Sequence, residues 1–509
     1  MTVAAPVGNP VPGLPAFGAV AEALARAANP DRFTRWEQLV AQTGYCAHPV
    51  RLHGRVTAVD RATGEAAPMY ESAGEPDGVL LTACGNRREN VCPTCSATYR
   101  ADTWQLVAAG LRGGKGIPAT VTAHPRLFVT VTAPSFGAVH SSRQVRHGAQ
   151  VCRPRTRRKL CPHGQPVGCA VRHGADESVL GTPICPDCYD YAGAVLFNAY
   201  APELWRRFTQ DVTRQLAARA GLSQRRLREL VRLAYVKVAE GQRRGLVHFH
   251  AVFRLDAAGD PLDVAPPPAR FTAELLAAAI RAAAAKVAVT TPPVADGAPG
   301  VVLRLGEQLD IRNLPTGRQD DVAGSPARLD ERTVAAYLAK YVTKSTTSTE
   351  LSDRQFTDTD IDALDPAKHL DRMALTAWEL AVVPGLADRR LRRWAHMLGF
   401  RGHVSSKSRR YSTTMTALRR ARVEHRVAQR SSEGGQTDPW GRPLDTAEDT
   451  GTVLLIADWR FAGVGHRTAG DAWLALTAAT NARERRNAAR SALRTTAGGG
   501  DRTGEASFP

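Results

Sequence analysis

The sequence is poor in lysine and contains no long apolar segment. The second absence excludes a protein with a membrane-spanning helix. Of its 67 lysine and arginine residues only 8 are lysine. No run of about 18 apolar residues occurs, which excludes a membrane-spanning helix. The first residues, MTVAAPVGNPVPGLPAFG, also lack a basic segment followed by a sustained apolar core. We therefore expect no signal peptide, no membrane partner and a cytoplasmic location.

A phosphate-binding loop is missing as well. The Gly-x-x-x-x-Gly-Lys-Ser/Thr spacing of nucleotide hydrolases does not occur. The nearest segment, residues 110–115, has the wrong spacing and is followed by another glycine. The sequence therefore predicts no ATPase or helicase activity in this chain.

The charge that is present is strongly positive. The 509 residues include 67 lysines and arginines against 49 aspartates and glutamates, a net charge of +18. This balance favours a polyanionic partner, most simply nucleic acid, and arginine binds phosphate through two hydrogen bonds. A GC-rich genome would also raise the ratio of arginine to lysine, but it would not explain the sign of the net charge.

More than half of this excess lies in residues 381–430, which carry 13 basic residues against Asp388 and Glu424. Aromatic residues Trp394, Phe400 and Tyr411 are interleaved with the arginines, a pattern typical of phosphate contact combined with base stacking. We predict a basic helical DNA-binding region at 380–430. Its contacts would come from Arg389, Arg390, Arg392, Arg393, Arg401, Lys407, Arg409 and Arg410. The alternative is a solvated helical face.

In a reducing compartment the nine cysteines are expected to be metal ligands rather than disulfides. Two Cys-x-x-Cys pairs have further cysteines upstream, which is typical of structural zinc sites. We assign one zinc ion to Cys46, Cys84, Cys92 and Cys95, and a second to Cys161, Cys169, Cys185 and Cys188. Cys152 is left over, and His163 or His173 could replace a member of the second group. The alternative is a set of free buried thiols.

Hydrophobic periodicity predicts a chain of mixed α and β structure. Strands are expected at 127–132, 231–239, 246–255 and 301–312, and a short glycine-flanked connector joins the second and third into a β-hairpin. Helices are expected at 31–44, 99–111, 201–220, 271–289 and 330–345, and through the basic segment 386–430. The tail after about residue 485 is rich in glycine, threonine and alanine and is predicted to be disordered.

Two histidines lie in the middle of the second strand of this hairpin. In the run His248-Phe249-His250, alternation places both imidazoles on one face, about 7 Å apart along the strand, where they can bind one divalent cation. Glu240, before the turn, would lie beside them and add an oxygen ligand, which suits Mg²⁺ or Mn²⁺ better than Zn²⁺. The alternatives are structural histidines and a solvated carboxylate.

Residues 337–344 carry a doubled Tyr-x-x-Lys pattern. Tyr337 and Tyr341 are four residues apart and share one helix face, with Lys340 and Lys344 close beside them. A tyrosinate can attack a phosphodiester and form a covalent phosphotyrosine, and nearby ammonium groups favour the phenolate. The alternative is an amphipathic helix with tyrosine on its half-buried edge.

Taken in order, residues 127–132 (LFVTVT), Glu240 with His248-Phe249-His250, and residues 337–344 resemble the three motifs of HUH endonucleases. More closely, the chain resembles the rolling-circle replication initiators of actinobacterial plasmids. The paired tyrosines are also similar to those of the initiators of small single-stranded DNA bacteriophages. Three further segments look like the plasmid family: CGNRRENVCPTC at 84–95, CPDCYDY at 185–191 and RRWAHMLGFRGH at 392–403.

The resemblance implies a metal-dependent, site-specific nickase and strand transferase. His248, His250 and Glu240 would hold the catalytic Mg²⁺ or Mn²⁺, and Tyr337 or Tyr341 would attack single-stranded plasmid origin DNA. Attack leaves a 5′-phosphotyrosine and a 3′-OH that primes synthesis, and the second tyrosine would act when the circle is released. Lys340 and Lys344 fit the family as helpers, and Thr130 and Thr132 would support the metal face. Host helicase and DNA polymerase would be partners.

The predicted fold is α+β, with an HUH-type central antiparallel sheet, flanking helices, zinc-binding insertions and a basic helical C-terminal region. We expect five regions: an N-terminal segment at 1–45, a first zinc-binding region at 46–120, the nuclease domain at 121–350 with an insertion at about 150–190, the basic region at 380–430, and the tail at 485–509. Two other functions fit the same motifs, namely an HUH transposase and a non-enzymatic zinc-dependent DNA-binding regulator.

Overall fold

The structure is a computed structural model whose chain divides into two compact units. Thr103–Thr413 form the larger unit, and the described parts of Met1–Asp102 and Thr414–Glu505 form the smaller one. The boundary divides the predicted basic region, 380–430, between the two units. The structure describes residues 17–142, 144–145, 148–155, 159–259, 264–295, 297–314, 331–343, 354–432, 439–440 and 453–497.

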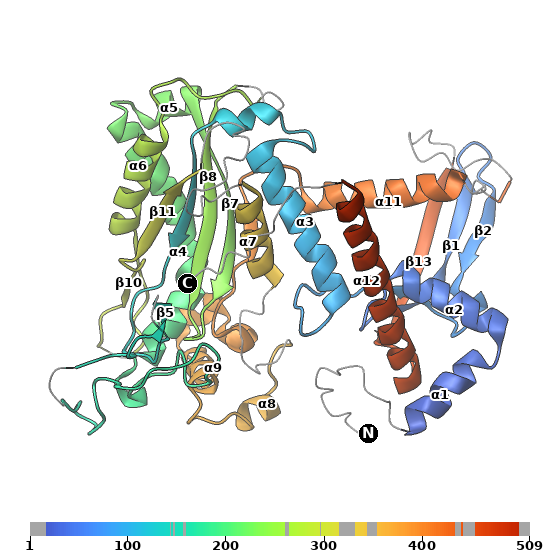
Figure 1. The fold of residues 1–509 in the computed structure, drawn as a ribbon, viewed down its shortest axis with the longest axis horizontal. Coiled ribbons are helices and arrows are strands. Elements are labelled where there is room, and N and C mark those ends of the chain that lie inside the picture. Colours follow the sequence, from blue (N-terminus) through green and yellow to red (C-terminus); the bar gives the residue numbers. More distant parts are fainter. Residues whose placement is uncertain are drawn as a thin grey trace. The chain divides into compact units, whose positions relative to one another are not determined.

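The larger unit is built on a five-stranded antiparallel sheet (Figure 1). Its strands lie in the order β11 (Leu309–Asn313), β4 (Arg126–Val131), β8 (Val247–Ala257), β7 (Val231–Gly241) and β12 (Ser405–Lys407). β7 and β8 form the predicted hairpin, and β8 is the central strand. The predicted combination of helices with an antiparallel sheet is confirmed.

Alternation along β8 gives the sheet two different faces. Phe249 and Phe253 point to one face and pack against Trp205 of α4 (Tyr191–Arg219), which in turn contacts α6 (Ala273–Lys286). His248 and His250 point to the opposite face, where α7 (Glu331–Thr343) lies. Because both faces are covered, β8 is buried along nearly its whole length, including the polar residues on the face toward α7.

Shorter elements complete the larger unit. Among the described residues between β4 and α4, regular structure is limited to two short strands, β5 (Gln144–Val145) and β6 (Gly148–Ala149), and one 3₁₀ turn, η3 (Pro186–Cys188). β9 (Ala288–Thr290) and β10 (Val302–Arg304) pair separately from the main sheet. The remaining α-helices are α5 (Gln224–Leu230), α8 (Asp358–Asp362), α9 (His369–Leu380) and α10 (Leu391–Trp394).

The smaller unit joins the first part of the chain to its last part. β1 (Val50–Asp60) pairs along its whole length with β13 (Val453–Val464), and β2 (Ala66–Glu71) and β3 (Leu80–Thr82) pair with the other edge of β1. Its helices are α1 (Phe17–Ala27), α2 (Pro30–Gln42), α11 (Met415–Ser432) and α12 (Ala469–Ala497), and α3 (Pro93–Arg112) begins in it. Within the described ranges no helix combines the length and the apolar character needed to cross a bilayer.

The structure departs from the sequence predictions in several elements. The single strand expected at 301–312 is divided into β10 and β11, because the first part pairs with β9 and the second with β4 of the main sheet. Between them Gly306 lies so close to the backbone of Ala133 that a Cβ atom would come within 2.7 Å of its carbonyl oxygen. The continuous helix expected at 386–430 is interrupted by β12 and by left-handed residues Arg390 and Leu398. The four strands of the smaller unit were not predicted.

The predicted disordered tail is wrong for its first part. Residues 485–497 continue α12 to Ala497, because arginine, alanine and leucine are good helix formers and outweigh the threonines there. The rest of that tail lies outside the described residues, as do Asp330, the expected first residue of the tyrosine helix, and Lys344.

Candidate active site and metal centres

Glu240, His248 and His250 converge on the sheet face that α7 covers. Oε2 of Glu240 lies 2.8 Å from Nε2 of His248 and 3.0 Å from Nε2 of His250, and the two imidazole nitrogens are 3.1 Å apart. The strand register explains this closeness, because Glu240 pairs directly with His248 across the hairpin. Glu240 and His250 are buried, at 9% and 2% exposure.

Neighbouring polar groups fix the orientation of both rings. Oγ1 of Thr130 lies 3.0 Å from Nδ1 of His250, and Nε2 of Gln242 lies 3.3 Å from Nδ1 of His248. The hydroxyl of Thr130 can accept a hydrogen bond from Nδ1 of His250, which leaves the lone pair of Nε2 directed at the shared centre. The predicted support of Thr130 beneath the histidines agrees with this contact, whereas Thr132 donates instead to the carbonyl of Gln308.

The charge of this cluster is set by competing effects on Glu240. Burial alone would raise the pKa of the carboxyl group, but hydrogen bonds and charge from His248 and His250 outweigh it and lower that pKa to about 2. The carboxylate is therefore ionised at neutral pH.

The donor atoms fit a divalent cation. All three lie within 4.8 Å of one another. Oxygen or nitrogen donors placed about 2.1 Å from an octahedral cation are about 3.0 Å apart, close to the separations found here. One carboxylate oxygen and two imidazole nitrogens can therefore occupy three neighbouring positions around one ion and leave the others open for a substrate.

Both predicted tyrosines lie beside this cluster. Oη of Tyr337 is 3.4 Å from Nε2 of His250, and the ring of Tyr341 is 5.4 Å from the imidazole of His250. The tyrosine rings are 4.4 Å apart, as expected for residues four apart on one helix. Phe128 of β4 packs edge-on against Tyr337. The structure thus brings together the histidine strand and the tyrosine helix, which are far apart in the sequence.

Burial affects the acidity of one of these phenols. Burial, and after it the neighbouring Tyr341 and the negative charge of Glu240, raise the pKa of Tyr337. A cation held by the cluster would oppose this effect, because positive charge favours the phenolate. Lys340 is on the same helix and is exposed.

An ion pair anchors α7 to the sheet. Nη1 of Arg126, at the start of β4, donates to Oε1 of Glu331, the first residue of α7, over 2.5 Å. Arg126 is fully buried and also donates to the backbone carbonyls of Leu111 and Thr122. This contact holds the helix end that precedes the tyrosines, and the sequence patterns did not indicate it.

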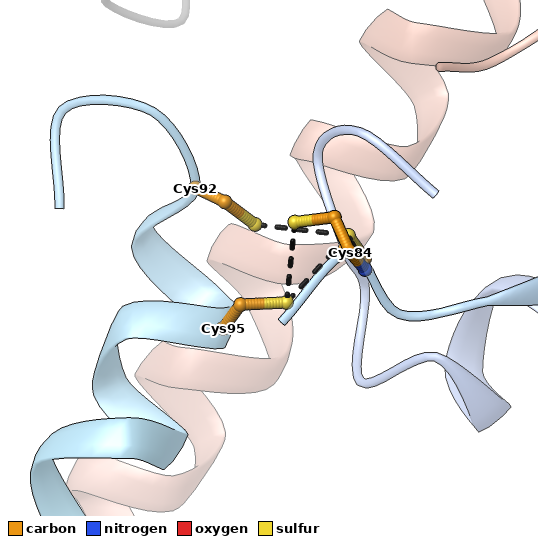
Figure 2. A group of neighbouring side chains, drawn as sticks. Cys84, Cys92 and Cys95 are labelled. Atoms are coloured by element: carbon orange, nitrogen blue, oxygen red, sulfur yellow. Dashed lines mark hydrogen bonds between the residues drawn. The ribbon is translucent and has the colours of Figure 1, made fainter. Parts of the chain in front are cut away.

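The first predicted cysteine group comes together in the smaller unit (Figure 2). Sγ of Cys46 lies 3.7 Å from Sγ of Cys92 and 3.6 Å from that of Cys95, and Sγ of Cys84 lies 3.7 Å from that of Cys95. Sulfurs about 2.3 Å from a tetrahedral zinc ion are about 3.8 Å apart, so this group fits zinc closely. The backbone N–H groups of Cys84 and Asn86 point at sulfurs of the group and would support thiolates.

The second predicted group comes together with one replacement, and the replacing residue is His163, an alternative that the sequence analysis allowed. Cys161, Cys185 and Cys188 come together, but with His163, whose Nδ1 lies 3.2 Å from Sγ of Cys188 and 3.8 Å from Sγ of Cys185. Cys169 lies elsewhere, because its backbone pairs with that of Arg153.

Cys169 belongs to a further group together with Cys152, the cysteine that the sequence left over. His140 and His173 complete this group, and its four ligand atoms all lie within 4.8 Å of one another. Burial, followed by the charges of His173 and Arg153, lowers the pKa of His140. A Cys-x3-His spacing at 169–173 was the available signal for this group in the sequence.

The predicted DNA-binding residues differ in exposure. Five are exposed, namely Arg390, Arg392, Arg393, Arg401 and Arg409. Three are half-buried: Arg389 stacks on Tyr200, burial lowers the pKa of Lys407, and Arg410 donates to the carbonyl of Gly259. Two of the aromatic residues expected to stack on bases are instead in the core, since Phe400 and Tyr411 are 1% and 0% exposed.

A basic pocket lies beside this segment in the larger unit. Lys115 stands at the tip of a tight turn that Gly114 and Ile117 close through two backbone hydrogen bonds. The pocket is lined by Lys115, Gly116, Ile117, Arg409, Arg410, Ser412 and Thr413. Lys115 is a candidate phosphate contact that the sequence did not indicate.

Comparison with known proteins gives matches that extend over most of the chain. A family model described as "Replication initiator protein, pSAM2" (RepSA) matches residues 32–480. A replication initiator protein of Streptomyces ambofaciens is 45% identical over 475 residues, which cover 92% of this chain and 95% of the relative. No solved structure matches the chain. The matched span includes the Glu-His-His cluster, both tyrosines and all nine cysteines.

Proposed function

The chain belongs to the pSAM2-type family of replication initiator proteins, and on that premise we propose that it nicks and rejoins one strand of plasmid origin DNA. In this proposal it is an HUH-type nuclease that acts on single-stranded DNA and starts rolling-circle replication. The observation that carries the proposal is the convergence of Glu240, His248 and His250 with Tyr337 and Tyr341 on one face of the sheet.

The chemistry is divided between a metal site and a nucleophile. Glu240, His248 and His250 would hold Mg²⁺ or Mn²⁺, which acts on the scissile phosphate as a Lewis acid. The Oη atom of Tyr337 lies 3.4 Å from His250 and is therefore next to the position of a phosphate bound at the cluster. The position supports nucleophilic attack by Tyr337, with Tyr341 as its neighbour.

The proposed nicking step forms one bond and breaks one bond. The tyrosine oxygen attacks phosphorus while the bond from phosphorus to the 3′ oxygen of the preceding nucleotide breaks. The tyrosine loses its proton and the leaving 3′ oxygen gains one, so no reductant, oxidant or nucleotide cofactor is needed. The products are a 5′-phosphotyrosine on the protein and a free 3′-OH that can prime DNA synthesis.

The second tyrosine gives the site a way to finish the cycle. After one round of synthesis the regenerated origin would be attacked by the tyrosine that is still free. The new 3′-OH would then displace the first phosphotyrosine and close the released circle. The 4.4 Å separation of the two rings supports this role, because both phenols can reach the same cluster.

The remaining features support binding rather than chemistry. Exposed arginines between Arg390 and Arg409 would contact phosphates, together with Lys115 at the basic pocket. Lys340 and Lys344 would assist near the tyrosines. Host helicase and DNA polymerase would supply the steps that this chain lacks.

We further propose structural zinc ions at Cys46, Cys84, Cys92 and Cys95, and at Cys161, His163, Cys185 and Cys188.

An adduct assay tests the proposal. Single-stranded oligonucleotides tiled along both strands of the plasmid that encodes the chain are incubated with the full-length protein and Mn²⁺, each labelled at either its 5′ or its 3′ end. A 5′-phosphotyrosine keeps the downstream DNA on the protein, so we expect the 3′ label to migrate with the protein in a denaturing gel. Y337F and Y341F should each lower adduct formation, and the double variant should abolish it.

Tyr70→Phe is the matched control. It removes a phenol that donates to Glu75 in the smaller unit, and we expect wild-type adduct formation. An adduct in the double variant would show that the tyrosine assignment is wrong, and transfer of the 5′ label would show the opposite polarity. Binding without any adduct on any oligonucleotide would favour the non-enzymatic regulator.

A further inference from the structure

We propose that His140, Cys152, Cys169 and His173 hold a third structural zinc ion. Nδ1 of His140 lies 3.2 Å from Nε2 of His173, and Sγ of Cys169 lies 3.4 Å from the same nitrogen. Tetrahedral zinc, with nitrogens at about 2.05 Å and sulfurs at about 2.3 Å, separates two nitrogens by about 3.3 Å and a nitrogen from a sulfur by about 3.6 Å. Both observed separations agree with a Cys₂His₂ site.

The surroundings of His173 orient it as a metal ligand. Its Nδ1 lies 2.6 Å from Oε2 of Glu177, and Oε1 of that carboxylate accepts a hydrogen bond from the backbone of Gly174. The carboxylate accepts a hydrogen bond from Nδ1–H, which leaves the lone pair of Nε2 directed at the other three ligands. Histidines that bind zinc commonly have such a carboxylate partner. This arrangement is an independent observation in favour of the site.

Backbone pairing brings the cysteine ligands together. The N–H of Cys152 donates to the carbonyl of Val171, and Arg153 and Cys169 exchange two backbone hydrogen bonds. The N–H of Ser141 points at Sγ of Cys152 over 3.2 Å and would stabilise a thiolate. Loops with so little apolar content need another source of stability, which a metal ion supplies.

The cysteine inventory also favours a third site. The Cys₄ group, the Cys₃His group and this Cys₂His₂ group together account for all nine cysteines of the chain. With only the Cys₄ and Cys₃His sites, Cys152 and Cys169 would be left without a metal; the third site uses both.

The third site lies next to the turn of the β7–β8 hairpin. Gly181 has φ +88° and approaches so closely that a Cβ atom there would come within 2.5 Å of the backbone of Arg243. The side chain of Arg243 donates to the carbonyl of Glu177 over 3.4 Å. A zinc ion at this site would hold the insertion against the turn that follows Glu240. Only this positioning role rests on the proposed nicking activity, and the metal site itself does not.

Counting zinc tests the inference. The full-length protein is purified in a His248→Ala background, so that zinc at the Glu240 cluster is not counted, and is dialysed into zinc-free buffer containing Mg²⁺. Elemental analysis should find three zinc ions per chain. Adding Cys152→Ser should lower the count to two, and adding His403→Ala, which removes an exposed histidine outside every group, should leave it at three.

A second measurement covers the case in which Cys152→Ser does not fold. The parent protein, unfolded in alkylating agent without reductant, should carry nine alkyl groups. Seven would indicate a disulfide and overturn the site, as would two zinc ions in the parent protein or three in a folded Cys152→Ser variant. Three zinc ions together with a negative adduct assay would support the third site and refute nicking. Two zinc ions together with a positive adduct assay would refute the third site and support nicking.

Discussion

Asp256, near the C-terminal end of β8, is the buried carboxylate partner of Arg254 and His124. Its carboxylate accepts two hydrogen bonds from Arg254, at 2.6 and 2.9 Å, and lies 2.8 Å from Nδ1 of His124. All three side chains are almost fully buried. Asp256→Asn removes the negative charge and leaves Arg254 buried without a counter-ion, so we expect a loss of about 3–5 kcal/mol in the free energy of unfolding at pH 7. Urea denaturation measures it, with exposed Asp310→Asn as a control expected to change little.

The same residue predicts a pH dependence. Burial would raise the pKa of Asp256, but His124 and Arg254 outweigh it and lower that pKa below its ordinary value of 3.8. A carboxyl group whose pKa is lowered by folding stabilises the protein above its unfolded pKa, and this stabilisation is lost as pH falls through the folded pKa. The difference between wild type and Asp256→Asn should therefore be constant above about pH 5 and shrink below about pH 3.8. A constant difference down to pH 2 would contradict this account.

Thr130 gives a prediction about the metal site. Thr130→Val keeps the shape of the side chain but removes the hydroxyl that lies 3.0 Å from Nδ1 of His250. Loss of a partner on the outer ring nitrogen typically weakens metal binding about 10–100-fold. We expect a weaker affinity for Mn²⁺ of that order in a titration followed by electron paramagnetic resonance. Thr132→Val, just after the end of the same strand, is the matched control and should bind Mn²⁺ like wild type, because Thr132 contacts Gln308 instead.

At the scale of elements, α7 depends on its contact with β4. Glu331→Gln would weaken the ion pair with Arg126 and allow the helix to shift relative to the metal cluster. Since a small displacement of a nucleophile lowers a rate strongly, we expect adduct formation to slow about tenfold or more while Mn²⁺ affinity is unchanged. Arg332→Gln changes the exposed neighbouring residue and should leave the rate unchanged. Equal rates in both variants would show that the ion pair does not position the tyrosines.

The elements that the sequence predicted well are those whose partners are local. A short turn sets the register of β7 and β8, so Glu240 could be expected beside His248. Helical spacing likewise placed Tyr337 beside Tyr341. The packing of that helix against His250 does not follow from either pattern, and only the resemblance to a known family indicated it.

Where partners are distant, the sequence was less informative. Cys169 was assigned to the wrong group because spacing does not show that its backbone pairs with Arg153. His163 was predicted only as an alternative member of the second group, and His140 was not predicted because it has no Cys-x-x-Cys signature. The strands of the smaller unit were missed because β1 alternates only weakly and finds its long partner, β13, at the other end of the chain.

For the molecule as a whole, the net charge predicts how DNA binding responds to salt. Neutralising one phosphate releases counterions, and the logarithm of affinity falls with the logarithm of salt concentration by about 0.7 per contact on single strands. Replacing Arg390, Arg393 and Arg401 with glutamine should therefore reduce this slope by about 2. A matched triple replacement of exposed Arg225, Arg226 and Arg228 on α5 removes the same charge, and we expect the wild-type slope. Equal slopes in the two triple variants would show that the total charge of the chain, and not the position of these arginines, sets the salt dependence.

The pairing of β1 with β13 has a consequence for biosynthesis. A ribosome adds about 5–20 residues each second, so β1 emerges tens of seconds before the strand that covers its edge. During that time the larger unit can complete its own sheet, whereas β1 exposes an edge that invites pairing with other nascent chains. A message cut before codon 453 would yield a protein with both tyrosines and the cluster of Glu240, His248 and His250 but with that edge permanently open. Such truncated products should be the ones that chaperones and proteases remove first.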